Sequence, residues 1–254
     1  MLFNNPISYA NIISGAAALI VSFLILIKNY KSGINLLFFV TFLLWGASWI
    51  LMGFLFLYEH PVIGAQVLRD FAAGSAIMSS FVFFTTAFVL FKGEHYLKKW
   101  YVSLPIIISS LISTIIVATF DYVVYDSPDG ITDIGEGIKT TQAPWVMIFL
   151  YIVPGLMIIT SLAYLIKTRI EVEETIIKKR ILYFIFGFSS IIFGMLIIGI
   201  SGVIEQLASL NQAAENAILL VGNGFWFIGP IICFIGFNVG RKLLVKKEEI
   251  KNES

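Results

Sequence analysis

Seven side chains combine types and positions that suit the binding of a small molecule. Arg69 and Asp70 form an adjacent pair of opposite charges, and Asn223 lies between Gly222 and Gly224, which permit close approach of another backbone. A buried amide requires hydrogen-bond partners, and aromatic rings offer a large apolar surface. Together these groups predict a mainly apolar pocket with a few polar groups, the usual form of a small-molecule site. The candidate ligand-binding residues are Trp49, Arg69, Asp70, Tyr151, Glu205, Asn223 and Trp226.

The same residues also have ordinary structural interpretations. Arg69 and Asp70 are typical of a charged pair that caps the start of a helix at a membrane interface. Trp45 and Trp49 share one helical face and are equally typical of an aromatic belt or of ordinary packing. The sequence leaves binding and packing open for these side chains.

Catalytic chemistry is not expected. The sequence contains no HExxH, GxSxG or Walker motif and no pair of Asp-rich prenyl-diphosphate motifs. His60 and His95 fall on opposite sides of the membrane in the span assignment, so they cannot share a metal ion. Cys233 is the only cysteine, which excludes an intramolecular disulfide and a thiolate metal cluster. We therefore expect no enzyme activity, no metal and no cofactor.

Membrane-spanning helices must position the candidate residues. Of the 254 residues, 58% are apolar and 13% are charged, and the mean hydropathy is +0.91. This composition is typical of an integral membrane protein. A spanning helix needs about 20 mainly apolar residues, and seven segments meet this requirement, which predicts an all-α polytopic membrane protein. The predicted spans are 7–27, 34–58, 70–91, 101–120, 144–166, 181–203 and 217–240.

The basic residues predict the orientation of these spans. Of the 17 Lys and Arg residues, 15 follow spans one, three, five and seven, and only Arg69 and Lys139 fall in the other loops. Positive charge near span ends is retained on the cytoplasmic side, so we expect a multi-pass protein of the cell membrane with its N-terminus outside. The basic loops are expected to contact lipid headgroups of the bilayer, and no nucleic-acid partner is expected. Residues 1–240 form the predicted bundle, and 241–254 form a short charged cytoplasmic tail.

The longest connection between spans, 121–144, has features of a small β-hairpin. Residues 122–125 are β-prone, 127–130 form a turn sequence with Pro and Gly, and 131–134 alternate in polarity. We expect this hairpin on the outer side, between spans four and five. The acidic residues of the loop do not follow the spacing of a calcium-binding loop, so they are interpreted as solvated.

Small residues and prolines indicate how the spans pack. Small residues spaced by four predict close contacts between helices. Prolines inside spans four, five and seven are expected to kink them. The small residues are Ala72, Ala76 and Ser80; Ser190 and Gly194; and Gly236 and Gly240, and the prolines are Pro105, Pro154 and Pro230.

The spans carry no ionisable residue at the predicted membrane midplane. Ion-coupled carriers usually place a titratable group there, so this pattern disfavours a proton or sodium carrier. The last span, 217–240, also lacks the lysine that would hold retinal as a Schiff base. Neither absence argues against a transporter of a neutral or apolar solute.

Apolar patterning with scattered Arg, Pro and Tyr runs through three parts of the sequence: LRDFAAGSAIMSSFVFFTTAFVLF followed by WYVSLPIII, GIKTTQAPWVMIFLYIV, and RIEVEETIIKKRILYFIFGFSSIIFG. In these parts, and over nearly the whole chain, the sequence resembles the seven-helix N-terminal sensor region of archaeal and bacterial membrane histidine kinases. The resemblance implies a receptor bundle whose outer half senses a ligand and whose last helix passes a signal inward. The sequence departs from that family because it contains no phosphoacceptor helix or ATP-binding domain up to Ser254. Kinase activity is therefore not expected.

The leading functional hypothesis is a stand-alone, receptor-like membrane sensor. It would bind a small molecule or a lipid in its outer half and signal through a separate cytoplasmic partner. Two alternatives stay open: a transporter of a neutral or apolar solute, and a structural subunit of a membrane complex.

Overall fold

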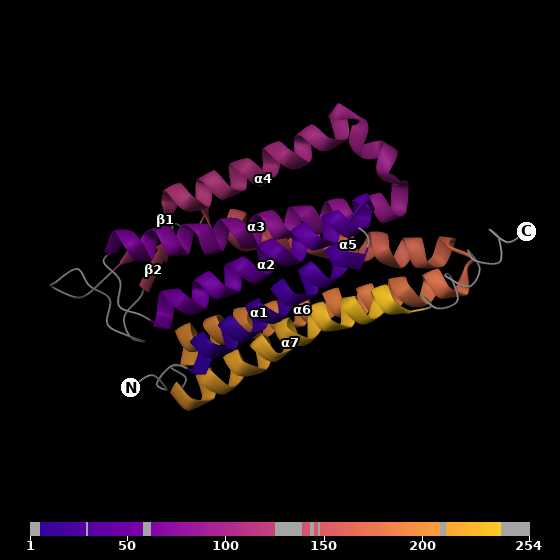
Figure 1. Ribbon diagram of the computed structural model, residues 1–254. Coiled ribbons are helices and arrows are strands. Elements are labelled where there is room, and N and C mark those ends of the chain that lie inside the picture. The colour runs from indigo at the N-terminus through magenta and orange to yellow at the C-terminus, as the bar shows by residue number, and fades with distance from the viewer. Residues whose placement is uncertain are drawn as a thin grey trace, which may run out of the picture.

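Figure 1 shows the computed structural model of the chain, which describes residues 6–28, 30–57, 62–124, 139–142, 145–146, 148–208 and 212–239. Seven helices in these ranges are long and apolar enough to cross a membrane. The prediction of seven apolar spans is confirmed, and the fold fits a polytopic membrane protein. The helices are α1 (Pro6–Lys28), α2 (Gly33–Leu57), α3 (Val62–Lys92), α4 (Trp100–Phe120), α5 (Val153–Glu171), α6 (Thr175–Ala208) and α7 (Gln212–Asn238), with a 3-10 turn η1 (Glu94–Lys98) and a π-helical turn η2 (Ile148–Ile152).

Two helices extend well beyond their predicted spans. α3 begins at Val62 rather than at residue 70, and α6 covers Thr175–Ala208 rather than 181–203. Apolar length marks only the part of a helix that suits hydrocarbon, whereas backbone hydrogen bonding continues into the interface until a breaker ends it. The predicted tail, 241–254, lies outside the described residues.

Two short strands lie between α4 and α5 in the chain. β1 (Asp121–Val124) pairs antiparallel with β2 (Lys139–Gln142), and Asp121 lies opposite Gln142. The return strand was predicted at 131–134 and the turn at 127–130, and both segments lie outside the described residues. The strand that pairs with β1 is therefore a different segment from the one predicted.

Six of the helices form a closed ring. α1 packs on α2, α2 on α3, α3 on α5, α5 on α6 and α6 on α7, and α7 returns to α1. α4 lies outside this ring against α3, as Figure 1 shows. In the most apolar window of α4 only 17% of the residues are buried, compared with 50% in α3. α4 therefore presents most of its apolar surface outward.

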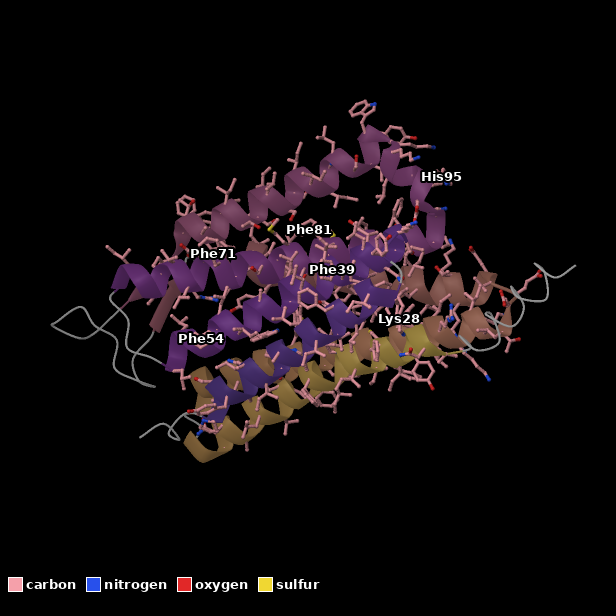
Figure 2. The ribbon with its side chains drawn as sticks, viewed as in Figure 1. Lys28, Phe39, Phe54, Phe71, Phe81 and His95 are labelled. Atoms are coloured by element: carbon pink, nitrogen blue, oxygen red, sulfur yellow. The ribbon has the colours of Figure 1, made fainter. Side chains whose placement is uncertain are left out.

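The two ends of the ring differ in charge. Because consecutive helices alternate in direction, α1, α3, α5 and α7 end where α2, α4 and α6 begin. Figure 2 labels Lys28 and His95 at this end, which is called the basic end below. Its described basic residues are Lys28, Lys31, Lys92, Lys98, Lys99, Lys167, Arg169, Lys178, Lys179 and Arg180. The strands lie at the opposite end, the strand end.

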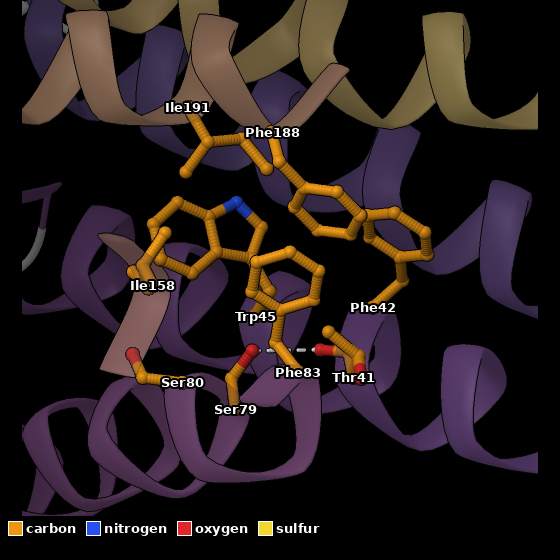
Figure 3. Close-up of a pocket in the computed structure, with 9 residues that line it drawn as sticks. All are labelled: Thr41, Phe42, Trp45, Ser79, Ser80, Phe83, Ile158, Phe188 and Ile191. Carbon is orange, nitrogen blue, oxygen red and sulfur yellow. Dashed lines mark hydrogen bonds between the residues drawn. The ribbon is translucent and has the colours of Figure 1, made fainter. Parts of the chain in front are cut away.

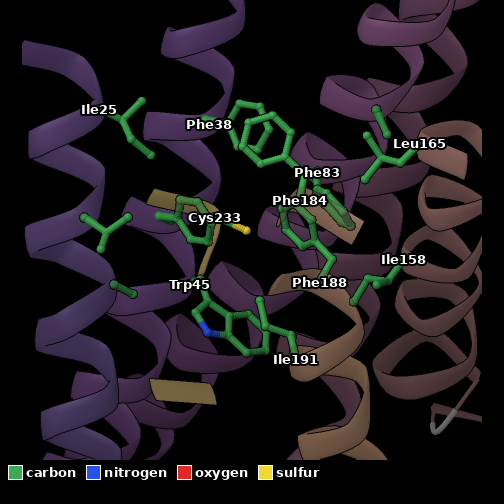
Figure 4. Packing of buried hydrophobic residues seen from close by; sticks show 14 of the residues in the cluster. Ile25, Phe38, Trp45, Phe83, Ile158, Leu165, Phe184, Phe188, Ile191 and Cys233 are labelled. Atoms are coloured by element: carbon green, nitrogen blue, oxygen red, sulfur yellow. The ribbon is translucent and has the colours of Figure 1, made fainter. Parts of the chain in front are cut away.

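Phenylalanine rings pack in the interior of the helix ring. The ring centroid of Phe38 lies 4.8 Å from that of Phe184 and 4.9 Å from that of Phe237. Those of Phe83 and Phe188 are 3.4 Å apart. The rings from α2, α3 and α6 belong to one buried cluster, much of which is drawn in Figure 4, and Phe237 of α7 packs against it. Toward the basic end the interior is therefore filled with aromatic side chains.

Glycines bring α6 against α7. A Cβ atom added at Gly187 would lie 2.4 Å from Sγ of Cys233 and 2.7 Å from the carbonyl oxygen of Gly229. One added at Gly194 would lie 2.6 Å from the indole of Trp226. Such contacts leave no room for a side chain, and close backbone approach is what holds helices together in lipid. This α6–α7 glycine seam includes the predicted small residue Gly194.

A second seam joins the first two helices. A Cβ atom at Gly15 would lie 2.7 Å from the carbonyl oxygen of Gly46, and one at Gly46 would lie 2.7 Å from that of Gly15. The helices at the beginning and at the end of the chain are thus two closely packed pairs. α1 and α7 join these pairs into the ring.

Candidate functional site

Three tryptophans from α2 and α7 meet inside the ring. The indoles of Trp49 and Trp226 are stacked, with ring centroids 3.7 Å apart and planes inclined by 28°. Trp45 meets both edge to face, with centroids 5.5 Å from Trp49 and 6.0 Å from Trp226. Trp45 and Trp49 are four residues apart and therefore share a helical face, as the sequence predicted. These three residues are called the tryptophan cluster below.

Polar atoms in the tryptophan cluster are incompletely paired. Nε1 of Trp226 donates a hydrogen bond to the carbonyl oxygen of Ile191, at 3.2 Å. Nε1 of Trp45 and Nε1 of Trp49 are both buried and have no hydrogen-bond partner among the described residues. Leaving a buried donor unpaired costs about 1–3 kcal/mol, so the cluster favours a bound group that accepts hydrogen bonds.

Asn223 lies on α7 one turn before Trp226 and is only 3% exposed. Its side-chain Nδ2 donates a hydrogen bond to the carbonyl oxygen of Leu219, at 3.1 Å. Its backbone carbonyl oxygen accepts a hydrogen bond from Oγ of Ser14 on α1, at 3.2 Å. The side-chain oxygen Oδ1 is buried without a partner in the described part of the chain. α7 therefore carries a buried acceptor without a partner one turn before Trp226, whose ring contacts Trp45 and Trp49.

A small cavity adjoins the tryptophan cluster. Its volume is about 20 Å³, which is room for about one water molecule. Trp45, which belongs to the tryptophan cluster, also lines the cavity, as Figure 3 shows. The lining residues come from α2, α3, α5 and α6 and are Thr41, Phe42, Trp45, Ser79, Ser80, Phe83, Ile158, Phe188 and Ile191.

The hydroxyl groups of the cavity wall are bonded to helix carbonyls. Oγ of Ser79 donates to the carbonyl oxygen of Thr41 at 2.9 Å, which ties α3 to α2. Oγ of Ser80 donates to Ala76 at 3.0 Å, and Oγ1 of Thr41 donates to Leu37 at 2.8 Å. Each hydroxyl oxygen keeps lone pairs that can accept a further hydrogen bond. The wall is therefore apolar apart from these acceptors and the indole of Trp45.

Arg69 of α3 lies at the same level along the ring as the part of the tryptophan cluster on α2. Two contacts set the register of α3 against α2: the Ser79–Thr41 hydrogen bond and the packing of Leu55 with Ala65. Continued along the antiparallel pair, this register places Arg69 level with the α2 part of the tryptophan cluster. Its side chain is only 7% exposed. A buried arginine inside an apolar bundle is costly and marks a position of functional interest.

Asp70 and Tyr151 are not among the residues that line the cavity. The carboxylate of Asp70 accepts a hydrogen bond from Nε2 of Gln66, at 2.7 Å. Tyr151 lies in η2 and is 50% exposed, so its side chain points away from the ring interior. The side chain of Glu205 lies outside the described part of the structure. Trp45 lines the cavity and contacts two of the seven candidates, Trp49 and Trp226. A single pocket shared by the seven candidates stays a prediction.

Sequence reasoning missed the polar residues of the cavity wall. Thr41 and Trp45 are four residues apart, as are Ser79 and Phe83, so each pair shares a helical face. This spacing was the available signal, because it places a hydroxyl group and a large aromatic ring on the same helical face. Ser80 was noticed only as a small packing residue.

Metal ligands are not grouped in the described residues, where no three His, Cys, Asp or Glu side chains lie together. No family model matches the chain, and a search of curated proteins found no match.

Proposed function

We propose that the chain is a seven-helix membrane sensor that binds a small neutral molecule or a lipid at the tryptophan cluster. The observation that carries the proposal is the set of unpaired buried groups: the indole N–H groups of Trp45 and Trp49 and the amide oxygen of Asn223. A hydroxyl group on a ligand would pair with both kinds of atom, since it accepts and donates. The indole rings and the apolar cavity wall would hold its hydrocarbon part.

Binding at this place would change how the helices pack. The cavity holds little more than a water molecule, so a larger ligand must displace Trp45 or separate α2 from α6. The tryptophan cluster includes Trp226 of α7, and the basic end of α7 is held by two polar side chains. Lys28 of α1 donates a hydrogen bond to Oδ1 of Asn238, and Nε of Arg180 on α6 donates to the carbonyl oxygen of Val239, at 2.8 Å. We infer that ligand binding shifts α7 against these two contacts and that a cytoplasmic partner recognises the shifted end.

The packing of the interior favours this proposal over a conduit. A transporter requires a path for its solute, and the buried phenylalanines of α2, α3 and α6 fill the interior toward the basic end. A structural subunit is the second candidate, and the outward apolar face of α4 favours it. A ligand-dependent change at the tryptophan cluster distinguishes the sensor from the structural subunit.

Ligand binding is expected to follow hydrogen-bonding capacity. In detergent, 1-octanol should raise the unfolding temperature more than 2-octanone, and octane should raise it least, because only the alcohol both accepts and donates. Saturating ligand at a hundredfold excess over Kd stabilises by about 2.7 kcal/mol. The measurements are thermal unfolding and quenching of tryptophan fluorescence.

Two variants locate that effect. Trp49→Phe keeps an aromatic ring and removes the N–H donor, so it should weaken the binding of both the alcohol and the ketone. Asn223→Ala removes the acceptor and should abolish only the advantage of the alcohol. Trp145→Phe is the matched control, because Trp145 is 43% exposed and lies outside the tryptophan cluster. Equal shifts in all three variants would show that the probes act on the micelle, and the sensor proposal would fail.

We also propose that the basic end faces the cytoplasm. Ten described lysine and arginine residues lie at this end, and positive charge is retained on the cytoplasmic side. A reporter fused after Ser254 should therefore be active in the cytoplasm, and a tag inserted at Asp129 should be labelled by an impermeant reagent added to intact cells. Labelling of both positions from the same side would contradict the orientation.

A further inference from the structure

Two lysine side chains from different helices converge on one aromatic ring at the basic end. Nζ of Lys92, the last residue of α3, lies 4.5 Å from the ring centroid of Phe91, and Nζ of Lys167 on α5 lies 5.0 Å from the same centroid. The two ammonium groups are therefore no more than about 9.5 Å apart, a separation comparable with the Debye length of about 8 Å at physiological ionic strength. A lysine that only reaches for water extends away from the bundle, whereas these two fold back toward a shared point.

No carboxylate in the described residues neutralises this pair. Neither Lys92 nor Lys167 forms an ion pair or a hydrogen bond there, and their contacts are with the ring of Phe91. The carboxylate of Glu94, two residues after Lys92, is directed at Gly33, at the beginning of α2. An anion placed between the two ammonium groups would relieve their repulsion.

An aromatic wall extends from this point toward the membrane interior. Phe84, Phe88 and Phe91 recur on one face of α3, and each lies beside Tyr164 of α5. The ring centroids of Tyr164 and Phe91 are 5.4 Å apart, and those of Tyr164 with Phe88 and Phe84 are 5.8 Å and 5.9 Å apart. All four side chains are partly exposed. The surface therefore combines two cations at the interface with an apolar wall beneath them.

We propose that this surface of α3 and α5 is a specific site for an anionic phospholipid. The phosphodiester group would lie between Nζ of Lys92 and Nζ of Lys167, and an acyl chain would lie along Phe84, Phe88 and Tyr164. A zwitterionic lipid presents its own cation beside the phosphate and is a poorer match to two ammonium groups. The site is separate from the tryptophan cluster and does not depend on the proposed sensing function.

Lipid titration of the purified full-length chain tests this site. Native mass spectrometry in a nonionic detergent would measure Kd for dioleoylphosphatidylglycerol, dioleoylphosphatidylcholine and inorganic phosphate. The K92Q/K167Q variant should bind phosphatidylglycerol roughly tenfold to thirtyfold more weakly, since each lysine near a membrane surface contributes on the order of 1 kcal/mol. The matched control is K178Q/K179Q, which removes the same charge from the same end of the bundle but from α6. It should change Kd less than twofold.

A further variant tests the contribution of the aromatic ring separately from that of the two lysines. Phe91→Leu keeps an apolar side chain and removes the ring on which both ammonium groups converge, so it should weaken phosphatidylglycerol binding severalfold. Tight binding of phosphatidylcholine, or an equal loss in K178Q/K179Q, would show that only the general charge of this end matters and would overturn the proposal. Binding of inorganic phosphate as tight as that of phosphatidylglycerol would show a simple anion site and would also overturn it.

Discussion

Replacing Gly187 by alanine is expected to destabilise the bundle by about 3 kcal/mol, the upper part of the usual range for overpacking. The new Cβ would lie 2.4 Å from Sγ of Cys233 and 2.7 Å from the carbonyl oxygen of Gly229. The cysteine side chain can rotate, but the carbonyl belongs to the backbone of α7. Relief therefore requires α6 and α7 to separate along their whole contact, where small residues hold them together in lipid.

The same chain offers a control for the Gly187 variant. A Cβ added at Gly224 meets no atom within 4 Å, so Gly224→Ala should be neutral or should stabilise slightly, as alanine favours the helix over glycine. Thermal unfolding of both variants in the same detergent is the measurement. The double variant G187A/C233A should recover only part of the loss, because the contact with Gly229 persists. Unfolding of G187A at the temperature of G224A would refute the close contact.

Trp226→Ala should cost about 3–5 kcal/mol, as expected for truncation of a large buried aromatic side chain. Trp226 is 3% exposed, stacks on Trp49, fits against Gly194 and donates its N–H to Ile191. Neighbouring helices approach too closely at the seam to refill the space by small movements. In a bilayer the loss comes from packing and the hydrogen bond, because lipid is as apolar as the interior.

Two comparisons make the Trp226 prediction specific. Trp226→Phe keeps a ring and removes the hydrogen bond, so its cost should be intermediate. Trp100→Ala should change stability by less than about 0.5 kcal/mol, since Trp100 is 72% exposed. Near-ultraviolet circular dichroism should lose the signal of the Trp49–Trp226 stack in both Trp226 variants. An unchanged spectrum would mean that the two indoles are not stacked in solution.

The number of helices was predictable from sequence because spanning imposes a minimum apolar length on each segment. Their ends were not, since apolarity and helical hydrogen bonding stop at different places. Arg69 illustrates the error: its charge was interpreted as marking the start of the third span, but α3 begins seven residues earlier, at Val62, and buries Arg69. The partner strand of β1 was also missed, because strand pairing depends on contacts that are distant in sequence.

The candidate site was predictable only where local spacing decides the geometry. Trp45 and Trp49 share a face because they lie four residues apart, and this was confirmed. The stacking of Trp49 on Trp226 depends on how the ring closes and has no local signal. The direction of the Tyr151 side chain also has no local signal. Tyr151 lies in a π-helical turn, whose extra residue changes the direction of the following side chains relative to a regular α-helix.

The closed ring also constrains the order in which contacts between helices can form during synthesis. The contact between Ser14 and Asn223 joins residues 209 positions apart, and the contact between Lys28 and Asn238 spans 210 positions. Gly15 and Gly46, by contrast, can meet as soon as α2 has been synthesised. At about 5–20 residues per second, α7 follows α2 only after roughly 10–40 s. The aromatic stack of Trp49 on Trp226 is therefore among the last contacts formed during biogenesis. A chain whose synthesis stalls before α7 contains Trp49 but has no Trp226 to stack on it.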